Sequence, residues 1–154
     1  MIQVQVNPSL KSFSGIRVLK KAAQVVLDYC QQGPGSDLSI LVTDDEQVHN
    51  LNHEYRNIDD TTDVLSFASM EKDPDTNHVY LGDVIISFDK ALKQADQAGH
   101  PVLVELQLLV VHGVLHLLGY DHAESDQKSR MWDTQNNILE LLDIHDVKIV
   151  TESD

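Results

Sequence analysis

The sequence predicts an α+β domain in which a small mixed β-sheet of about four strands packs with about five helices. Three observations lead to this prediction. Short segments with strand patterns are interspersed with longer segments of helical periodicity. Hydrophobic residues make up 42% of the 154 residues, enough for a sizeable core. One helical segment is apolar almost all round, which predicts a central buried helix. The length is typical of one domain, and we interpret residues 1–154 as such.

The first elements alternate between strand and helix. Residues 2–6 (IQVQV) alternate apolar and polar side chains, as a half-buried strand does. Residues 12–31 carry apolar side chains at the spacing of an amphipathic helix, and Gly33-Pro34-Gly35 is expected to end it. Residues 38–43 (LSILVT) then predict a buried strand.

The middle of the chain predicts a helix followed by two strands. Thr43 and Glu46 fit a capping box, which would open the helix. Residues 63–68 and 79–87 are typical of strands, and the segment EKDPDTN between them is rich in turn residues. We therefore expect these two strands to be antiparallel neighbours.

Three helices are predicted in the last part of the chain. Residues 88–98 form the first, which ends at Gly99, and Pro101 suits the first position of the second. This second helix is the apolar central one, and Gly119 is expected to end it. The last helix is expected from about residue 124 to 142. Its inner face consists of Met131, Trp132, Gln135, Ile138, Leu139 and Leu142.

Composition excludes several classes of protein. The start of the chain lacks the basic and apolar regions of a secretory signal, and no apolar run reaches 18 residues. We therefore expect a cytoplasmic protein that does not cross a membrane. The single cysteine, Cys30, rules out an internal disulfide and a cysteine-rich zinc site.

The net charge of −14 is unevenly distributed along the chain. Residues 1–34 carry Lys11, Arg17, Lys20 and Lys21 against one aspartate, a net charge of +3, whereas the remaining 120 residues carry −17. An acidic protein disfavours a nucleic-acid partner. The basic N-terminal segment is either an ordinary solvated surface or a local contact for a polyanion.

Three histidines lie within eleven residues, in HGVLHLLGYDH. His112 and His116 are four residues apart, so on a helix they share one face, with Cβ atoms about 5–6 Å apart. Once Gly119 ends the helix, His122 can turn back toward the same point. The spacing H-x3-H-x2-G-x2-H is that of the metzincin zinc signature. Three neutral imidazoles suit one Zn²⁺ per chain and leave a fourth position open for water, as in catalytic sites.

Two features of this segment limit the chemistry that it predicts. A pair of histidines at this spacing also occurs as a hydrogen-bonded pair in a core, and it is the third histidine that favours a metal. In zinc proteases a glutamate follows the first histidine and acts as general base, whereas here that position is Gly113. The pattern therefore favours a hydrolysis other than proteolysis. Asp121, next to His122, is either an acceptor that orients an imidazole or a cap.

The histidine segment closely resembles the signature of the YbeY family of bacterial rRNA-maturation endoribonucleases. Two other stretches are similar to motifs of this family and occur in its order. They are LNHEYRNIDDTTDVLSF, residues 51–67, which contains Arg56, and LGDVIIS, residues 81–87. The resemblance covers most of residues 40–122.

The resemblance implies a zinc-dependent, single-strand-preferring endoribonuclease that acts in 16S rRNA 3′-end maturation and ribosome quality control. It implies RNA as substrate, the small ribosomal subunit as partner, and zinc ligation by His112, His116 and His122. It also points to Arg56 as a catalytic residue, since a guanidinium group can hold two phosphate oxygens and stabilise developing charge. Asn57 and Thr61 stand where family members often carry Gly and Pro, so we expect the loop after Arg56 to differ in shape.

Several assignments stay open at this point. Asp83 and Asp121 are candidates for the general base, with a structural cap or turn as the alternative for each. The basic segment from Lys11 to Lys21 is a candidate for contact with the RNA backbone. Two other functions compete with the endoribonuclease. One is a metal-dependent hydrolase of peptides or amides, and the other is a non-catalytic ribosome-assembly factor with a structural metal.

Overall fold

The computed structural model describes residues 1–145, and residues 146–154, the end of the predicted domain, lie outside the described residues. The described chain has an α+β fold with four strands and five helices, which confirms the predicted fold class. The strands are β1 (Ile2–Val6), β2 (Ser36–Thr43), β3 (Val64–Lys72) and β4 (Val79–Ser87). The helices are α1 (Ile16–Tyr29), α2 (Asp45–Arg56), α3 (Phe88–Ala98), α4 (Val102–Leu117) and α5 (Ser125–Leu141).

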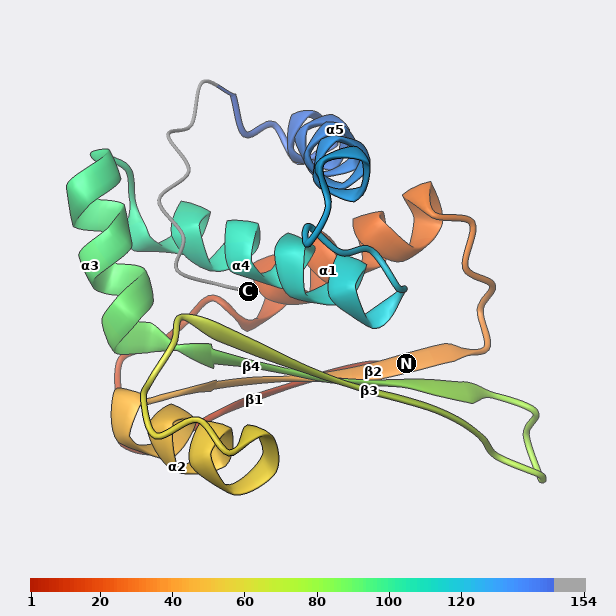
Figure 1. Ribbon diagram of the computed structural model, residues 1–154, viewed down its shortest axis with the longest axis horizontal. Coiled ribbons are helices and arrows are strands. Elements are labelled where there is room, and N and C mark those ends of the chain that lie inside the picture. Colours follow the sequence, from red (N-terminus) through yellow and green to blue (C-terminus); the bar gives the residue numbers. More distant parts are fainter. Residues whose placement is uncertain (146–154) are drawn as a thin grey trace.

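The four strands form one mixed sheet in the order β1-β2-β4-β3. β1 and β4 each pair in parallel with β2, and β3 pairs antiparallel with β4, as predicted for these neighbours. β1 and β3 are therefore the two edge strands. Helices α1, α3, α4 and α5 lie on one side of the sheet, and α2 lies on the other (Figure 1).

Alternating residues of the strands build an apolar core on each face of the sheet. Ile40 of β2 and Val84 of β4 belong to the large core under the four helices. Leu65 of β3 and Ile85 of β4 point the other way and pack with Val48 of α2 in a smaller core. The face on which a strand residue lies can therefore be assigned from its neighbours.

Helix α4 is the central helix, and 11 of its 16 residues are buried. It packs against α1, α3, α5 and the strands β3 and β4. Its close approach to the sheet depends on Gly113, because a Cβ atom there would lie 2.6 Å from Cγ1 of Val84. The Ser66 hydroxyl of β3 donates to the Gly113 carbonyl at 3.0 Å and fastens the two elements together. Pro101 was predicted as the first residue of α4, but it is the N-cap, and the helix begins at Val102.

In the described part of the chain, no single helix is both long and apolar enough to cross a bilayer. Helices α3 and α4 taken together meet that length and composition, but they are bent by 115° at the break between them.

Helix α1 begins four residues later than its periodicity predicts. It starts at Ile16, with Gly15 as its N-cap, and not at residue 12. The segment before it turns, and the ring of Phe13 packs edge to face on Phe88 with a centroid separation of 6.1 Å. Phe13 is therefore apolar because it packs on Phe88, and not because it belongs to the helix. Lys11 lies before α1.

The start of helix α2 also differs from the prediction. Its N-cap is Asp44, whose carboxylate accepts the backbone N–H of Gln47 at 2.9 Å. The predicted capping box of Thr43 and Glu46 is wrong, because Thr43 is the last residue of β2. Its hydroxyl instead bonds to the side chain of Gln47.

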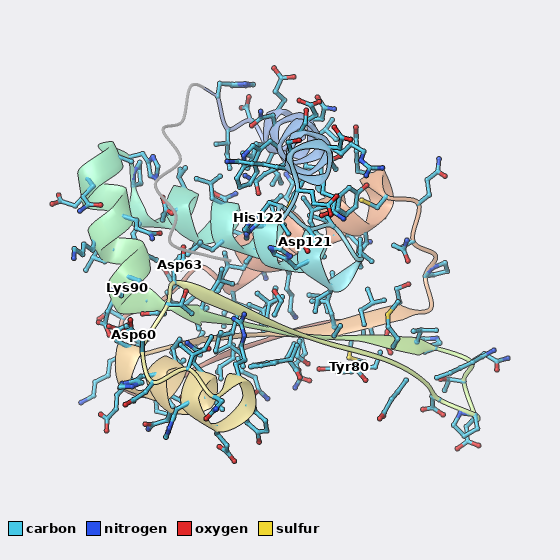
Figure 2. The ribbon with its side chains drawn as sticks, viewed as in Figure 1. Asp60, Asp63, Tyr80, Lys90, Asp121 and His122 are labelled. Atoms are coloured by element: carbon cyan, nitrogen blue, oxygen red, sulfur yellow. The ribbon has the colours of Figure 1, made fainter. Side chains whose placement is uncertain are left out.

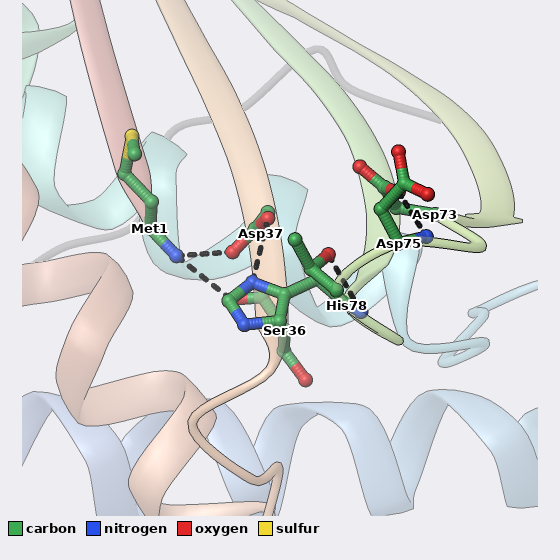
Figure 3. A network of polar contacts seen from close by, with 7 residues as sticks. Met1, Ser36, Asp37, Asp73, Asp75 and His78 are labelled. Atoms are coloured by element: carbon green, nitrogen blue, oxygen red, sulfur yellow. Dashed lines mark hydrogen bonds and ion pairs between the residues drawn. The ribbon is translucent and has the colours of Figure 1, made fainter.

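The hairpin between β3 and β4 is tied to the start of β2 by a polar network (Figure 3). β3 was predicted to end at residue 68, but it continues to Lys72. Nδ1 of His78, at the end of the hairpin turn, lies 3.2 Å from Oδ2 of Asp37. The Met1 amino group also bonds to Asp37. The Met1 ammonium group and, to a smaller extent, His78 lower the pKa of Asp37 from its ordinary value.

Candidate metal centre

Three histidines come together at the C-terminal end of α4. The rings of His112 and His116, on successive turns of this helix, have centroids 4.7 Å apart. Gly119 follows the helix with a φ of +96°, a left-handed conformation that glycine adopts without strain. The chain turns there, and His122 returns beside α4, under α5 (Figure 2). The structure thus brings together the three residues that the sequence predicts as ligands.

The ring nitrogens have the spacing of a metal ligand set. One nitrogen from each ring lies within 4.8 Å of the other two. Nε2 of His112 is 3.1 Å from Nε2 of His116. Two nitrogens bound to one tetrahedral zinc ion at about 2.0–2.1 Å are about 3.3 Å apart. Nε2 of His122 is buried and finds no hydrogen-bond partner within residues 1–145. A metal ion would satisfy this nitrogen, so the three side chains fit one.

Gln135 of α5 orients the most buried of these histidines. Its Oε1 lies 3.1 Å from Nδ1 of His112, and both side chains are buried. Because the amide oxygen can only accept, Nδ1 carries the proton and Nε2 presents its lone pair. A partner of this kind fixes the tautomer and orientation of a metal ligand. Periodicity places Gln135 only on the inner face of the last helix. Its contact lies 23 residues away and leaves no local pattern.

Trp132, also on α5, forms an apolar wall beside the histidines. Its ring stacks on His122 with a centroid separation of 5.9 Å and an interplanar angle of 18°. It also lies 5.6 Å from the ring of His112. These contacts restrict rotation of the imidazoles and shield one side of them from water. Helix α5 therefore holds in place the ligands that α4 and its following loop supply.

A cleft of about 270 Å³ adjoins the histidines at the β3 edge of the sheet. It is lined by Tyr55, Arg56, Val64, Ser66, Phe67, Ala68 and His116. Val64 and Ser66 face α4, whereas Phe67 packs on the α2 side, so the cleft crosses the edge strand. Arg56 is the last residue of α2 and enters the cleft from that far side. Arg56 and His116 thus line the same cleft.

The two departures from the family motif after Arg56 have structural explanations. Asn57 is the C-cap of α2 with a φ of 58°, a left-handed conformation that asparagine adopts more readily than most residues. The Thr61 hydroxyl donates to Oδ1 of Asp45 at 2.7 Å, a bond that proline cannot make. In addition, the Asn52 amide donates to the carbonyl of Asp60, which Figure 2 labels, at 2.9 Å. The loop is thus fastened back onto α2.

The two carboxylates considered as bases have different surroundings. Oδ1 of Asp121 accepts the backbone N–H of His122 at 2.7 Å, so Asp121 shapes the turn that carries this ligand. Asp83 pairs across the hairpin with Phe67 and lies on the α2 face of the sheet. It accepts a hydrogen bond from Tyr80. The sheet separates Asp83 from the histidines, and a base role there does not fit this position.

The basic side chains of the N-terminal segment lie apart from the cleft. Arg17, Lys20 and Lys21 are exposed on α1, which packs along β1 and α4. β1 is the edge strand opposite β3. Lys11 lines a different, mostly apolar hollow beside Phe13. Any contact of these residues with RNA therefore lies outside the cleft that holds Arg56.

The position after His112 has no room for a catalytic side chain. Gly113 faces the sheet, and its added Cβ would meet Cγ1 of Val84 at 2.6 Å and Oγ of Ser66 at 3.3 Å. A glutamate there would have to displace the helix. Close packing thus explains this glycine and counts against a protease-like mechanism.

Comparison with known proteins relates the chain to one family. Residues 3–143 match the family model described as Endoribonuclease YbeY. The chain is 40% identical to Endoribonuclease YbeY of Dehalococcoides mccartyi, over 92% of this chain and 99% of that protein. It is 42% identical to Endoribonuclease YbeY of Roseiflexus castenholzii, over 84% and 87%. The fold is similar to the solution structure of TM1509 from Thermotoga maritima, with a TM-score of 0.62 and 24% identity over 92% and 89%.

Proposed function

Because this chain belongs to the YbeY family of endoribonucleases, we propose that it is a zinc-dependent endoribonuclease that cleaves single-stranded regions of ribosomal RNA. The observation that carries this proposal is the shared cleft. Arg56 and His116 line it together, and His116 is one of three histidines whose ring nitrogens converge. A guanidinium group beside a cation site suits a phosphodiester, which is an anion with two free oxygens.

The residues of the chain divide the work between holding and binding. His112, His116 and His122 would hold the metal ion, and Gln135 keeps His112 in the tautomer that can ligate. When bound, zinc supplies positive charge that polarises a phosphoryl oxygen or lowers the pKa of a bound water. Arg56 binds the non-bridging oxygens and stabilises the charge that develops on them during cleavage.

We propose further that the chain acts in 16S rRNA 3′-end maturation and ribosome quality control in the cytoplasm. The acidic character of the chain supports a substrate presented by the small ribosomal subunit. A net charge of −14 repels free RNA, and the basic side chains of α1 lie away from the cleft. Weak binding to free RNA is then compatible with efficient cleavage of a positioned segment.

The experiment compares cleavage of one RNA as a single strand and as a duplex by the zinc-loaded protein. The parent should cleave the single strand faster. Arg56→Ala should lower that rate by about 10²–10³, the cost of losing one transition-state donor. Its melting temperature and zinc content should stay at the parent's values. Arg17→Ala, an exposed arginine on α1, is the matched control and should retain full activity.

Three results would contradict the proposal in different ways. Loss of zinc or of folding in Arg56→Ala would make this arginine structural. Hydrolysis of a peptide library without cleavage of RNA would favour the peptide or amide hydrolase. A zinc-loaded protein that cleaves neither substrate and binds the small subunit would favour the assembly factor.

A further inference from the structure

An exposed aromatic ring stands at the α2 side of the cleft. Tyr55, in the last turn of α2, is 65% exposed and lines the cleft next to Arg56. Its ring meets Phe67 edge to face, with centroids 5.8 Å apart and an interplanar angle of 63°. Phe67 is partly buried and packs on the smaller core. The partly buried ring of Phe67 thus supports one side of the exposed ring of Tyr55.

Packing of the protein does not account for Tyr55. Neither apolar core of the described residues includes it. The other strongly exposed tyrosine, Tyr29, is 41% exposed and accepts a hydrogen bond from Asn137 at 3.0 Å. Tyr55 instead turns most of its ring toward solvent. It lies beside Arg56 and the histidine cluster, which we propose bind the phosphodiester. A large exposed ring in a cleft lined by both charged and apolar side chains suits a flat ligand group.

We propose that Tyr55, supported by Phe67, stacks on the base of a nucleotide adjoining the phosphate that is cleaved. This inference rests on the proposed endoribonuclease function and adds the part of the substrate that the cleft recognises. Tyr55 lines the same cleft as Arg56 and His116, so a base next to a phosphate bound between Arg56 and the histidines is within reach of the ring. Bases stack on aromatic rings with little dependence on their identity, because each has a π-face.

The subsite supplies a physical reason for a preference for single strands. A base within a duplex is stacked on both faces and paired along one edge, so it is unavailable to Tyr55. An unpaired base can turn out onto the ring. The cleft therefore selects a nucleotide because it is unpaired and not because of the identity of its base.

The test uses the zinc-loaded protein and single-stranded RNA oligonucleotides that each lack the base at one position near the cleavage point. At one position, loss of the base should lower kcat/KM of the parent about tenfold, in the range expected for one stacked base. Tyr55→Ala should cleave the intact RNA about tenfold more slowly and lose no further rate at that position. Tyr55→Phe keeps the ring and should match the parent. Tyr29→Ala is the control for loss of an exposed tyrosine and should also match it.

Other results would refute either the subsite or the proposed function. If the parent cleaves RNA but responds to no missing base, or if Tyr55→Ala responds as the parent does, the subsite is refuted and the endoribonuclease function stands. If Tyr55→Ala loses zinc or melts at a clearly lower temperature, the ring is structural and the subsite is refuted. If the parent cleaves no RNA at all, the proposed function fails and the subsite fails with it.

Discussion

Replacing Gly113 by alanine tests whether the close contact of α4 with the sheet positions the proposed metal ligands. The added methyl group would lie 2.6 Å from Cγ1 and 3.2 Å from Cγ2 of Val84. Val84 is fully buried, and a β-branched side chain has few rotamers into which it can withdraw. The helix must therefore lift from the sheet. Such a shift carries His112 and His116 with it and strains the Ser66 hydrogen bond to Gly113.

Two opposing effects set the magnitude. Alanine is a better helix former than glycine by about 0.8–1.0 kcal/mol. Overpacking of a full core typically costs about 1–3 kcal/mol. A weakened hydrogen bond from Ser66 adds about 0.5–1.5 kcal/mol to this cost. The losses exceed the gain, so the free energy of unfolding should fall by about 0.5–3.7 kcal/mol, and the affinity for the proposed zinc ion should fall as well.

Urea denaturation followed by circular dichroism measures the free energy of unfolding, and competition with a chelator measures the zinc affinity. Gly33→Ala is the matched control, because no atom lies within 4 Å of a Cβ at Gly33. It should change the free energy of unfolding by less than about 0.5 kcal/mol. Adding Val84→Ala to Gly113→Ala makes room for the methyl group, so the double variant should lose less than the sum of the two single variants. A Gly113→Ala protein as stable as the parent, or more stable, would refute the reasoning.

Three more predictions concern the ligands and a buried carboxyl group. His116→Ala should be largely free of metal by elemental analysis, and full occupancy would contradict the assigned ligand set. Gln135→Leu should weaken zinc binding by about 10–100-fold in the chelator assay, since Nδ1 of His112 loses its acceptor, whereas Gln135→Glu should retain affinity. Unchanged affinity in Gln135→Leu would remove the orienting role. Burial raises the pKa of Glu105, Asp63 raises it further, and the hydrogen bond with His100 opposes both. The stabilising contribution of Glu105 is therefore complete below its ordinary pKa of 4.5 and is lost as pH rises through the folded value. Urea titrations from pH 4 upward should show the parent losing unfolding free energy relative to Glu105→Gln, and parallel curves would argue against it.

Periodicity and turn residues were sufficient for most of the fold. The apolar run around His112 predicted the central helix, and Gly119 predicted its end, because these signals are local. The predicted start of α1 was wrong. Phe13 continues the apolar spacing, but its ring packs on Phe88, 75 positions later in the chain. The capping box was wrong because Asp44 and Thr43 both suit a cap, and only the length of β2 decides between them.

The candidate site divides along the same line between local and distant contacts. The spacing of the three histidines along the sequence was enough to predict that they lie together. The orienting role of Gln135 depends on the packing of α5 on α4, which no local pattern encodes. Asp83 is unsuitably placed because its side chain lies on the face of the sheet that α2 covers. The sequence reveals neither which face each β4 residue occupies nor which face α2 covers.

The closeness of the three proposed ligands in the sequence has a consequence for how the chain would acquire the proposed metal ion. His112, His116 and His122 are so close in the sequence that holding them together costs the unfolded chain little loop entropy. The unfolded chain would therefore retain some affinity for the proposed ion, and the ion would stabilise the folded state by less than its full affinity implies. Chain synthesis proceeds from the N-terminus, so this segment exists before Trp132 and Gln135 do. Capture of the ion can thus precede completion of the fold, whereas the finished ligand geometry waits for α5.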